Sequence, residues 1–320
     1  MEARRTRRLF LIIIALLLVS FLFIGVVTYL MFKVYTQARP YVALVELAGV
    51  IDYSKPLLGG AITPDDVKTL FDMVKGDFNA KAVVLVVNSP GGTLAAFEVY
   101  ELVKELSREK IVVTYITGYG TSGGYLITLP SKEIVAHPTA FVGSIGAVAT
   151  VINYKGLLDK LGVNVTVVKS GDLKDVGSPF RELEPSDLKI LRDLVEGVAR
   201  VFAEKVREHR GDKIKDYREI LRAGVYTGVN AEMLGLVDRV GVLEDAIERA
   251  RELAGLPGDA PAIKVERRLT LIDILLGRVS FKTPSMTREP LVVEVLVMWP
   301  LPANLVDKTV LLVISNWLES

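Results

Sequence analysis

The chain contains no cysteine and only two histidines among its 320 residues. Cysteine nucleophiles, thiolate metal sites and a disulfide framework are therefore excluded. The charges almost cancel, with 39 Lys and Arg residues against 38 Asp and Glu residues. Since there is no excess of positive charge to neutralise phosphates, nucleic acid is not an expected partner. No cluster of His, Asp and Glu has metal-ligand spacing, and we expect neither a metal nor another cofactor.

One long hydrophobic run lies near the N-terminus. Residues 9–32 contain no charged side chain, and as a helix they would extend roughly 36 Å, enough to cross a hydrocarbon core of about 30 Å. The run is too long for a secretory signal, and no small-residue cleavage site follows it, so we expect an uncleaved transmembrane anchor. The positive-inside rule predicts that residues 1–8 are cytoplasmic and that the rest is extracytoplasmic. The charges on the two flanks are Arg4, Arg5, Arg7 and Arg8 against Lys33 and Arg39.

After a linker at residues 33–40, residues 41–256 have the pattern of an α/β domain. Continuous apolar runs predict strands at 82–87 and 111–116, and apolar residues at helical spacing predict a helix at 94–106 between them. A strand, a helix and a strand at this spacing form a parallel βαβ unit. The other predicted elements are strands at 41–47, 133–136 and 163–169, a helix that opens at Thr63 and Pro64, and helices at 185–210, 216–223 and 244–254.

Residues 257–320 form a C-terminal extension that begins with a Gly- and Pro-rich segment. Residues 270–276 are a short helix candidate. Two later apolar runs, at 291–298 and 309–318, are too short to span a membrane. Each of these two runs could form a strand, an oligomer contact or an interfacial segment.

Ser122 is the candidate nucleophile. It follows a predicted strand directly and begins a predicted helix, so the N–H of Gly123 and the positive helix end lie beside its hydroxyl. The sequence NSPGGT at 88–93 also joins a strand to a helix, and its glycines can present N–H groups to an anion. A carbonyl attacked by Ser122 could therefore place its negative charge against the N–H groups of Gly92 and Gly123.

A serine hydroxyl is a poor nucleophile without a neighbouring base, and Lys174 is the candidate for this role. An amine accepts a proton at neutral pH only where burial or a cationic neighbour lowers its pKa, so we expect a partly desolvated lysine. Lys169 is the alternative base. His137 could instead join Ser122 and an aspartate in a triad, although the proline that follows it restricts its backbone.

Two aspartates, Asp172 and Asp175, flank the candidate lysine in the segment KSGDLKD at 169–175. We expect both to lie in a loop or to face solvent. Neither is expected to act as an acid in the reaction.

Taken together, these motifs resemble the signal peptide peptidase A family, membrane-anchored serine peptidases with the Clp protease/crotonase fold. The resemblance covers residues 41–255 and depends on NSPGG at 88–92, SGGY at 122–125, VGSIG at 142–146, KSGDLKD at 169–175 and YTGVNAEMLGLVD at 226–238. It implies that Ser122 is the nucleophile, Lys174 the general base and Gly92 an oxyanion donor. It also implies that Ser144 lies beside the lysine and positions it or relays its proton. Thr121 departs from the small residue usual before the nucleophile, and the tail has no counterpart.

The resemblance implies a membrane-anchored serine endopeptidase with a Ser-Lys dyad, which cleaves hydrophobic peptides such as released signal peptides. Processing of a stomatin-type membrane protein is an alternative within the same family. A crotonase-like acyl-CoA enzyme is disfavoured by an extracytoplasmic site, and a non-catalytic peptide-binding scaffold is a further alternative. The resemblance also implies a homo-oligomer whose neighbouring chains can share one site.

Overall fold

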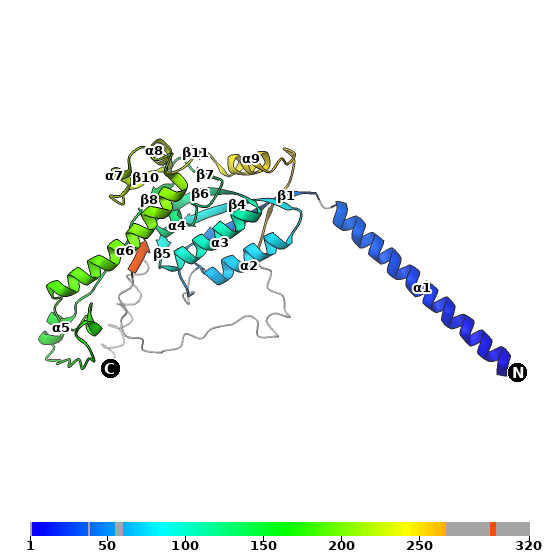
Figure 1. Ribbon diagram of the computed structural model, residues 1–320, viewed down its shortest axis with the longest axis horizontal. Helices are drawn as coiled ribbons and strands as arrows, with labels where there is room; N and C mark the ends of the chain where they lie inside the picture. The colour runs from blue at the N-terminus through cyan, green and yellow to red at the C-terminus, as the bar shows by residue number, and fades with distance from the viewer. Residues whose placement is uncertain (1, 38, 55–59, 267–294, 299–320) are drawn as a thin grey trace.

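The computed structural model describes residues 2–37, 39–54, 60–266 and 295–298. Helix α1 (Glu2–Gln37) extends away from the rest of the protein as a single long rod (Figure 1). Its segment Ile12–Lys33 has a mean hydropathy of 2.8 and no buried part, so by length and composition it can cross a membrane. The remaining elements form an α/β body, which confirms the predicted class.

Among the described residues, the main sheet contains eight strands, and all its pairs are parallel except β8 with β10. Its longest path runs β10-β8-β6-β4-β1-β12, and β7 extends the sheet from the first half of β6 to β11. Central strands are buried on both faces, which explains their continuous apolar sequences. The bounds are β1 (Tyr41–Ala48), β4 (Ala80–Ser89), β6 (Ile111–Thr121), β7 (Glu133–Ala136), β8 (Phe141–Gly143), β10 (Val225–Thr227), β11 (Arg239–Val240) and β12 (Ala262–Lys264).

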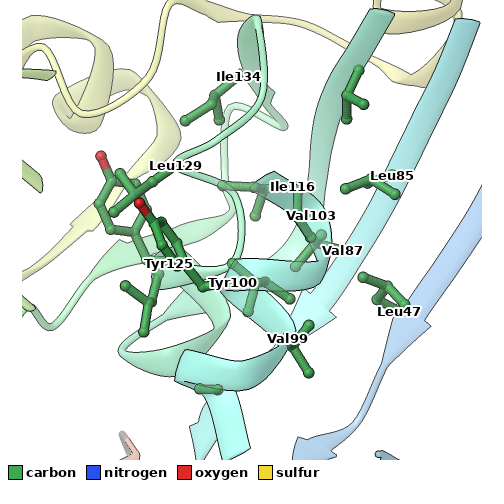
Figure 2. Packing of buried hydrophobic residues seen from close by; sticks show 14 of the residues in the cluster. Leu47, Leu85, Val87, Val99, Tyr100, Val103, Ile116, Tyr125, Leu129 and Ile134 are labelled. Carbon is green, nitrogen blue, oxygen red and sulfur yellow. The ribbon is translucent and has the colours of Figure 1, made fainter. Parts of the chain in front are cut away.

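Helices cover both faces of this sheet (Figure 1). Alternate residues of β4 point to opposite sides, so Val83 and Leu85 belong to the core under α2 (Pro64–Gly76) and α3 (Ala95–Glu109). Val84 belongs to the core under α9 (Leu243–Leu253). Figure 2 shows the first of these cores, in which side chains of α3 pack against strand residues including Leu85, Val87 and Ile116.

The start of α2 agrees with its sequence signals. Thr63 is the N-cap residue, and its hydroxyl oxygen accepts a hydrogen bond from the N–H of Asp66 at 3.3 Å. Pro64 occupies the first turn, where its missing N–H costs nothing. The predicted opening of a helix at these two residues is confirmed.

Helix α6 (Pro185–Arg210) joins the core through its C-terminal half, where Phe202 and Val206 are buried. Its N-terminal half carries a segment that lies away from the sheet, with α5 (Lys155–Lys160) and the 3-10 turn η1 (Asp172–Asp175) (Figure 1). The helix predicted at 185–210 is confirmed. The remaining helices are α4 (Gly123–Leu126), α7 (Tyr217–Ile220) and α8 (Gly228–Leu234).

The strand predicted at 163–169 is wrong. This stretch is irregular, and its valines are exposed, with Val168 at 93%. A strand needs a neighbouring edge for its backbone hydrogen bonds, and among the described residues none pairs with this stretch. Its apolar side chains are therefore left exposed in the single chain.

A smaller second sheet, described with the order β3-β2-β5-β13-β9, lies beside the nucleophile turn. Part of the apolar run at 291–298 forms its strand β13. The candidate helix at 270–276 and the run at 309–318 lie outside the described residues. The bounds are β2 (Val50–Ile51), β3 (Ala61–Ile62), β5 (Gly91–Gly92), β9 (Val148–Ala149) and β13 (Val295–Met298).

Candidate active site

Ser122 lies at the turn between β6 and α4 in an unusual backbone conformation. Its φ is 54° and its ψ is −124°, a combination that residues with a side chain rarely adopt. The N–H of Ser122 donates to the carbonyl oxygen of Gly143 at 2.7 Å, and its own carbonyl accepts from Tyr125 at 2.9 Å. Such strain persists only where the surroundings impose it, and it concentrates at functional sites.

The turn leaves one backbone donor free beside the serine. Within the described structure, the N–H of Gly123 has no protein acceptor. Ser122 itself is only 2% exposed. A free N–H at the start of a helix next to a shielded hydroxyl is an arrangement that can stabilise a developing oxyanion.

The NSPGGT loop is fastened to this turn. The hydroxyl of Thr121 donates to the carbonyl oxygen of Pro90 at 3.2 Å, so the larger residue before the nucleophile has a structural use. Gly124 packs on the same loop so closely that a Cβ atom there would lie 2.2 Å from the carbonyl oxygen of Ser89. These two contacts hold the candidate oxyanion loop against the nucleophile turn.

Position 92 must be a glycine for the packing of the chain, apart from any contact with a ligand. A Cβ atom on Gly92 would lie 1.8 Å from the carbonyl oxygen of Ile51, and Gly91 has a φ of 104°. The N–H of Thr93 also donates to the Ile51 carbonyl at 2.8 Å. The glycine pair therefore packs the loop onto β2, a reason that the sequence alone did not suggest.

Ser144 is linked to the nucleophile through its neighbour. It is 7% exposed, has a φ of 53° and donates its N–H to the carbonyl oxygen of Gly224 at 2.7 Å. It follows Gly143, whose carbonyl accepts the N–H of Ser122. The structure thus brings Ser122, Gly123, Gly92 and Ser144 into one region at the end of β6.

Lys174 is not part of that region in the single chain. It belongs to η1, its side chain is exposed, and its segment lies at the end of α6 that is away from the sheet (Figure 1). The described contacts include none between Lys174 and the nucleophile turn. The partly desolvated lysine expected from the sequence is therefore absent from an isolated copy.

The segment that carries Lys174 is joined to the start of α6 by ion pairs. Nε of Arg181 lies 2.9 Å from the Asp175 carboxylate, and Nη2 lies 3.0 Å from Oδ1 of Asp187. Asp187 also accepts the N–H of Glu184 at 3.0 Å, which closes the first turn of α6. Hydrogen bonding to Arg181 lowers the pKa of both aspartates. We call Asp175, Arg181 and Asp187 the arginine clamp.

The clamp adds detail to the expectation that the flanking aspartates lie in a loop or face solvent. Asp175 lies in the short turn η1, and its side chain is only 10% exposed, because Lys169 and Arg181 contact its carboxylate. Asp172 is exposed, as expected. No motif in the sequence around Asp175 predicted that Arg181 would be its partner.

The two alternative bases are engaged elsewhere. Nζ of Lys169 lies 2.6 Å from Asp175 and donates to the carbonyl of Asp172, so this ammonium is a member of an ion pair. Nδ1 of His137 lies 2.9 Å from Oγ1 of Thr139 within its own turn. Among the described residues, no group of three or more His, Asp or Glu side chains could hold a metal ion.

Comparison with known proteins assigns this chain to a class. Residues 104–257 match Peptidase family S49. A protein of Methanocaldococcus jannaschii provisionally named a protease is 38% identical over 212 residues, which are 64% of this chain and 67% of the relative. A protein of Enterococcus faecium provisionally named signal peptide peptidase SppA is 33% identical over 206 residues, 63% of this chain and 59% of the relative.

The chain is therefore a peptidase of the class that these proteins represent. More particularly, it belongs to Peptidase family S49, and the predicted resemblance to signal peptide peptidase A is confirmed. A solved membrane-bound stomatin-specific protease superposes with a TM-score of 0.45 at 13% identity, covering 72% of this chain and 100% of that one. Together with helix α1, the family relatives indicate association with a membrane.

Proposed function

We propose that this protein is a membrane-anchored serine endopeptidase that uses Ser122 and Lys174 to cleave hydrophobic peptides, such as signal peptides released into the membrane. The observation that carries the proposal is the strained backbone of Ser122, held beside the free N–H of Gly123. The provisional name of the Enterococcus faecium relative supports this class of substrate.

The chemistry follows from the groups in the site. The amine of Lys174 takes the proton of the Ser122 hydroxyl as the oxygen bonds to the substrate carbonyl carbon. The resulting oxyanion accepts hydrogen bonds from the N–H groups of Gly92 and Gly123. The proton then passes to the leaving amine, and the acyl-enzyme is hydrolysed by a water that the same lysine activates. Ser144 positions the lysine or relays its proton.

The position of Lys174 supports a site completed by a second copy of the chain. The irregular segment around it exposes many apolar side chains, which a water-facing loop would not favour. Burial of this segment against another copy would remove water from Lys174 and could bring its amine to the partner's nucleophile turn. The exposed apolar residues are Ile152, Leu157, Leu161, Val163, Val165, Val167, Val168, Leu173 and Phe180.

The proposed orientation places the site outside the cytoplasm. Residues 1–8 carry four arginines and would remain on the cytoplasmic side, while α1 crosses the bilayer. The peptidase body would then lie on the opposite side, close to hydrophobic segments that remain in the membrane.

The assignment of the nucleophile is tested with a fluorophosphonate probe on the full chain in detergent. Wild-type protein should be labelled, and Ser122→Ala should abolish both labelling and hydrolysis of a fluorogenic hydrophobic peptide. Ser186→Ala is the matched control, because Ser186 is an exposed serine on α6. Undiminished labelling of Ser122→Ala would refute the nucleophile.

A further inference from the structure

The strand β13 occupies a central place in the smaller sheet although it comes from the C-terminal extension. It runs antiparallel to β5, with Val297 opposite Gly92 and Met298 opposite Gly91. Its two preceding residues run antiparallel to β9, with Leu296 opposite Val148. Figure 1 shows β13 in orange beside β5.

β13 fills a slot between two strand edges. Among the described residues, the order is β3-β2-β5-β13-β9, in which β13 joins β5 to β9. The first half of β13, residues 295 and 296, pairs with β9, and the second half, residues 297 and 298, pairs with β5, so the two edges together hold one extended segment. The slot is therefore suited to an extended peptide segment, from this chain or from another.

The slot adjoins the candidate catalytic groups. One wall contains Gly92, the proposed oxyanion donor, and the Thr121 hydroxyl holds the residue before that wall, Pro90, against the nucleophile turn. The other wall, β9, follows Ser144 by a few residues. An extended peptide in this slot is thus placed as a protease substrate would be, by addition of a strand to open edges.

We propose that residues 295–298 occupy the substrate slot of their own chain and inhibit the peptidase competitively until a substrate strand displaces them. This inference rests on the proposed function. The sequence VLVM is uncharged and apolar, like the proposed substrates, and the tail competes at the high local concentration of a tethered ligand.

A disulfide lock tests the occupancy directly, because the wild-type chain has no cysteine to interfere. Val148 and Leu296 are opposite residues, and opposed residues of antiparallel strands lie about 4.5–5.5 Å apart between Cα atoms, within the range of a disulfide. In the full chain that carries Val148→Cys and Leu296→Cys, mild oxidation should form the bond and reduce peptide hydrolysis at least tenfold. Reduction should restore it.

The matched control combines Val148→Cys with Met298→Cys, two residues out of register. It should form little disulfide and keep its activity under oxidation. Failure of the in-register pair to form the bond, or full activity of its oxidised form, would overturn the inference.

A second variant weakens the strand without a crosslink. Val297 pairs with Gly92 in β5, so Val297→Pro should weaken this pairing, because proline cannot donate to a ladder, whereas Val297→Ile keeps its N–H. Loss of one ladder hydrogen bond should lower the apparent KM of the proline variant about fivefold, with kcat unchanged. Equal KM values for the two variants would contradict the inference.

Fluorophosphonate labelling separates the two possible failures. If no form of the protein is labelled at Ser122, the proposed function fails. If Ser122 is labelled equally in the oxidised and reduced locked variant, the function stands and only the inhibitory tail is refuted.

Discussion

Two inactive variants should restore each other's activity when they assemble together. Ser122→Ala removes the proposed nucleophile, and Lys174→Ala removes the proposed base. Each alone should lose on the order of 10³-fold or more in peptide hydrolysis, because dyad members act as a unit. Within one copy the two side chains are in different environments, with Ser122 buried beside α4 and Lys174 exposed in η1.

The size of the recovery follows from the proposed sharing of each site between two chains. A mixed assembly forms an intact site wherever a Lys174→Ala chain supplies the serine and a Ser122→Ala neighbour supplies the lysine. When the two variants are present in equal amounts and assemble in random order, half of the sites have a chain with an intact serine, and half have a neighbour with an intact lysine. In a symmetric assembly, about one quarter of the sites therefore contain both groups. We therefore expect about one quarter of wild-type activity from the mixture.

The assay coexpresses the two full-length variants with different affinity tags, purifies through both tags and measures hydrolysis of a fluorogenic hydrophobic peptide. A chain with both substitutions, coexpressed with Ser122→Ala, is the control, since no arrangement of these two chains contains an intact serine. Coassembled single variants that are no more active than either alone would refute the shared site. Light scattering and the double purification verify that mixed oligomers formed.

Three further outcomes test other parts of the structure. Gly92→Ala should lower stability by about 1–3 kcal/mol and slow hydrolysis, because the new Cβ meets the Ile51 carbonyl. The control Gly76→Ala, with open space around its Cβ, should melt like wild type in circular dichroism, and equal melting of both variants would contradict the packing. Arg181→Ala should slow hydrolysis on the order of tenfold or more by releasing the lysine segment, measured as kcat, and an unchanged kcat would exclude a role for the arginine clamp. The lowered pKa of Asp175 means that its stabilisation is present above about pH 4 and is lost as the pH falls further. The melting temperature should therefore fall more between pH 6 and pH 3 in wild type than in Arg181→Ala, and equal falls would contradict the ion pair.

The elements that the sequence predicts well are those whose pattern has a single physical cause. β4 and β6 are continuous apolar runs because both of their faces are covered by helices. The helix at 185–210 begins at a proline and has apolar residues at helical spacing, and α6 has these bounds. Local chemistry determines such elements, so the sequence is sufficient to place them.

Features that depend on partners far away in the sequence could not be predicted from the sequence. The valines at 163–169 satisfy a strand pattern, but no strand of the described sheets pairs with them. The arginine clamp joins residues six positions apart on either side of Arg181, with no periodic signal. β13 pairs with Gly92 across about two hundred residues of sequence, and such long-range register cannot be read from an apolar run alone.

The strain at Ser122 was also invisible in the sequence. Ser-Gly-Gly is common in turns, and its positive φ depends on hydrogen bonds to Gly143 and Tyr125 that only the folded sheet supplies. The motif predicted which residue to examine. The geometry of that residue is a property of the assembled sheet.

The short connection between α1 and the body limits where the peptidase can work. Helix α1 ends at Gln37, and β1 begins at Tyr41. In the proposed orientation, in which Ile12–Lys33 span a bilayer, the four residues to the helix end add about 6 Å, and the link to β1 adds at most about 14 Å when fully extended. The first strand would then start within about 20 Å of the lipid headgroups. Such a short tether would hold the peptidase body close to polypeptides that emerge from the bilayer.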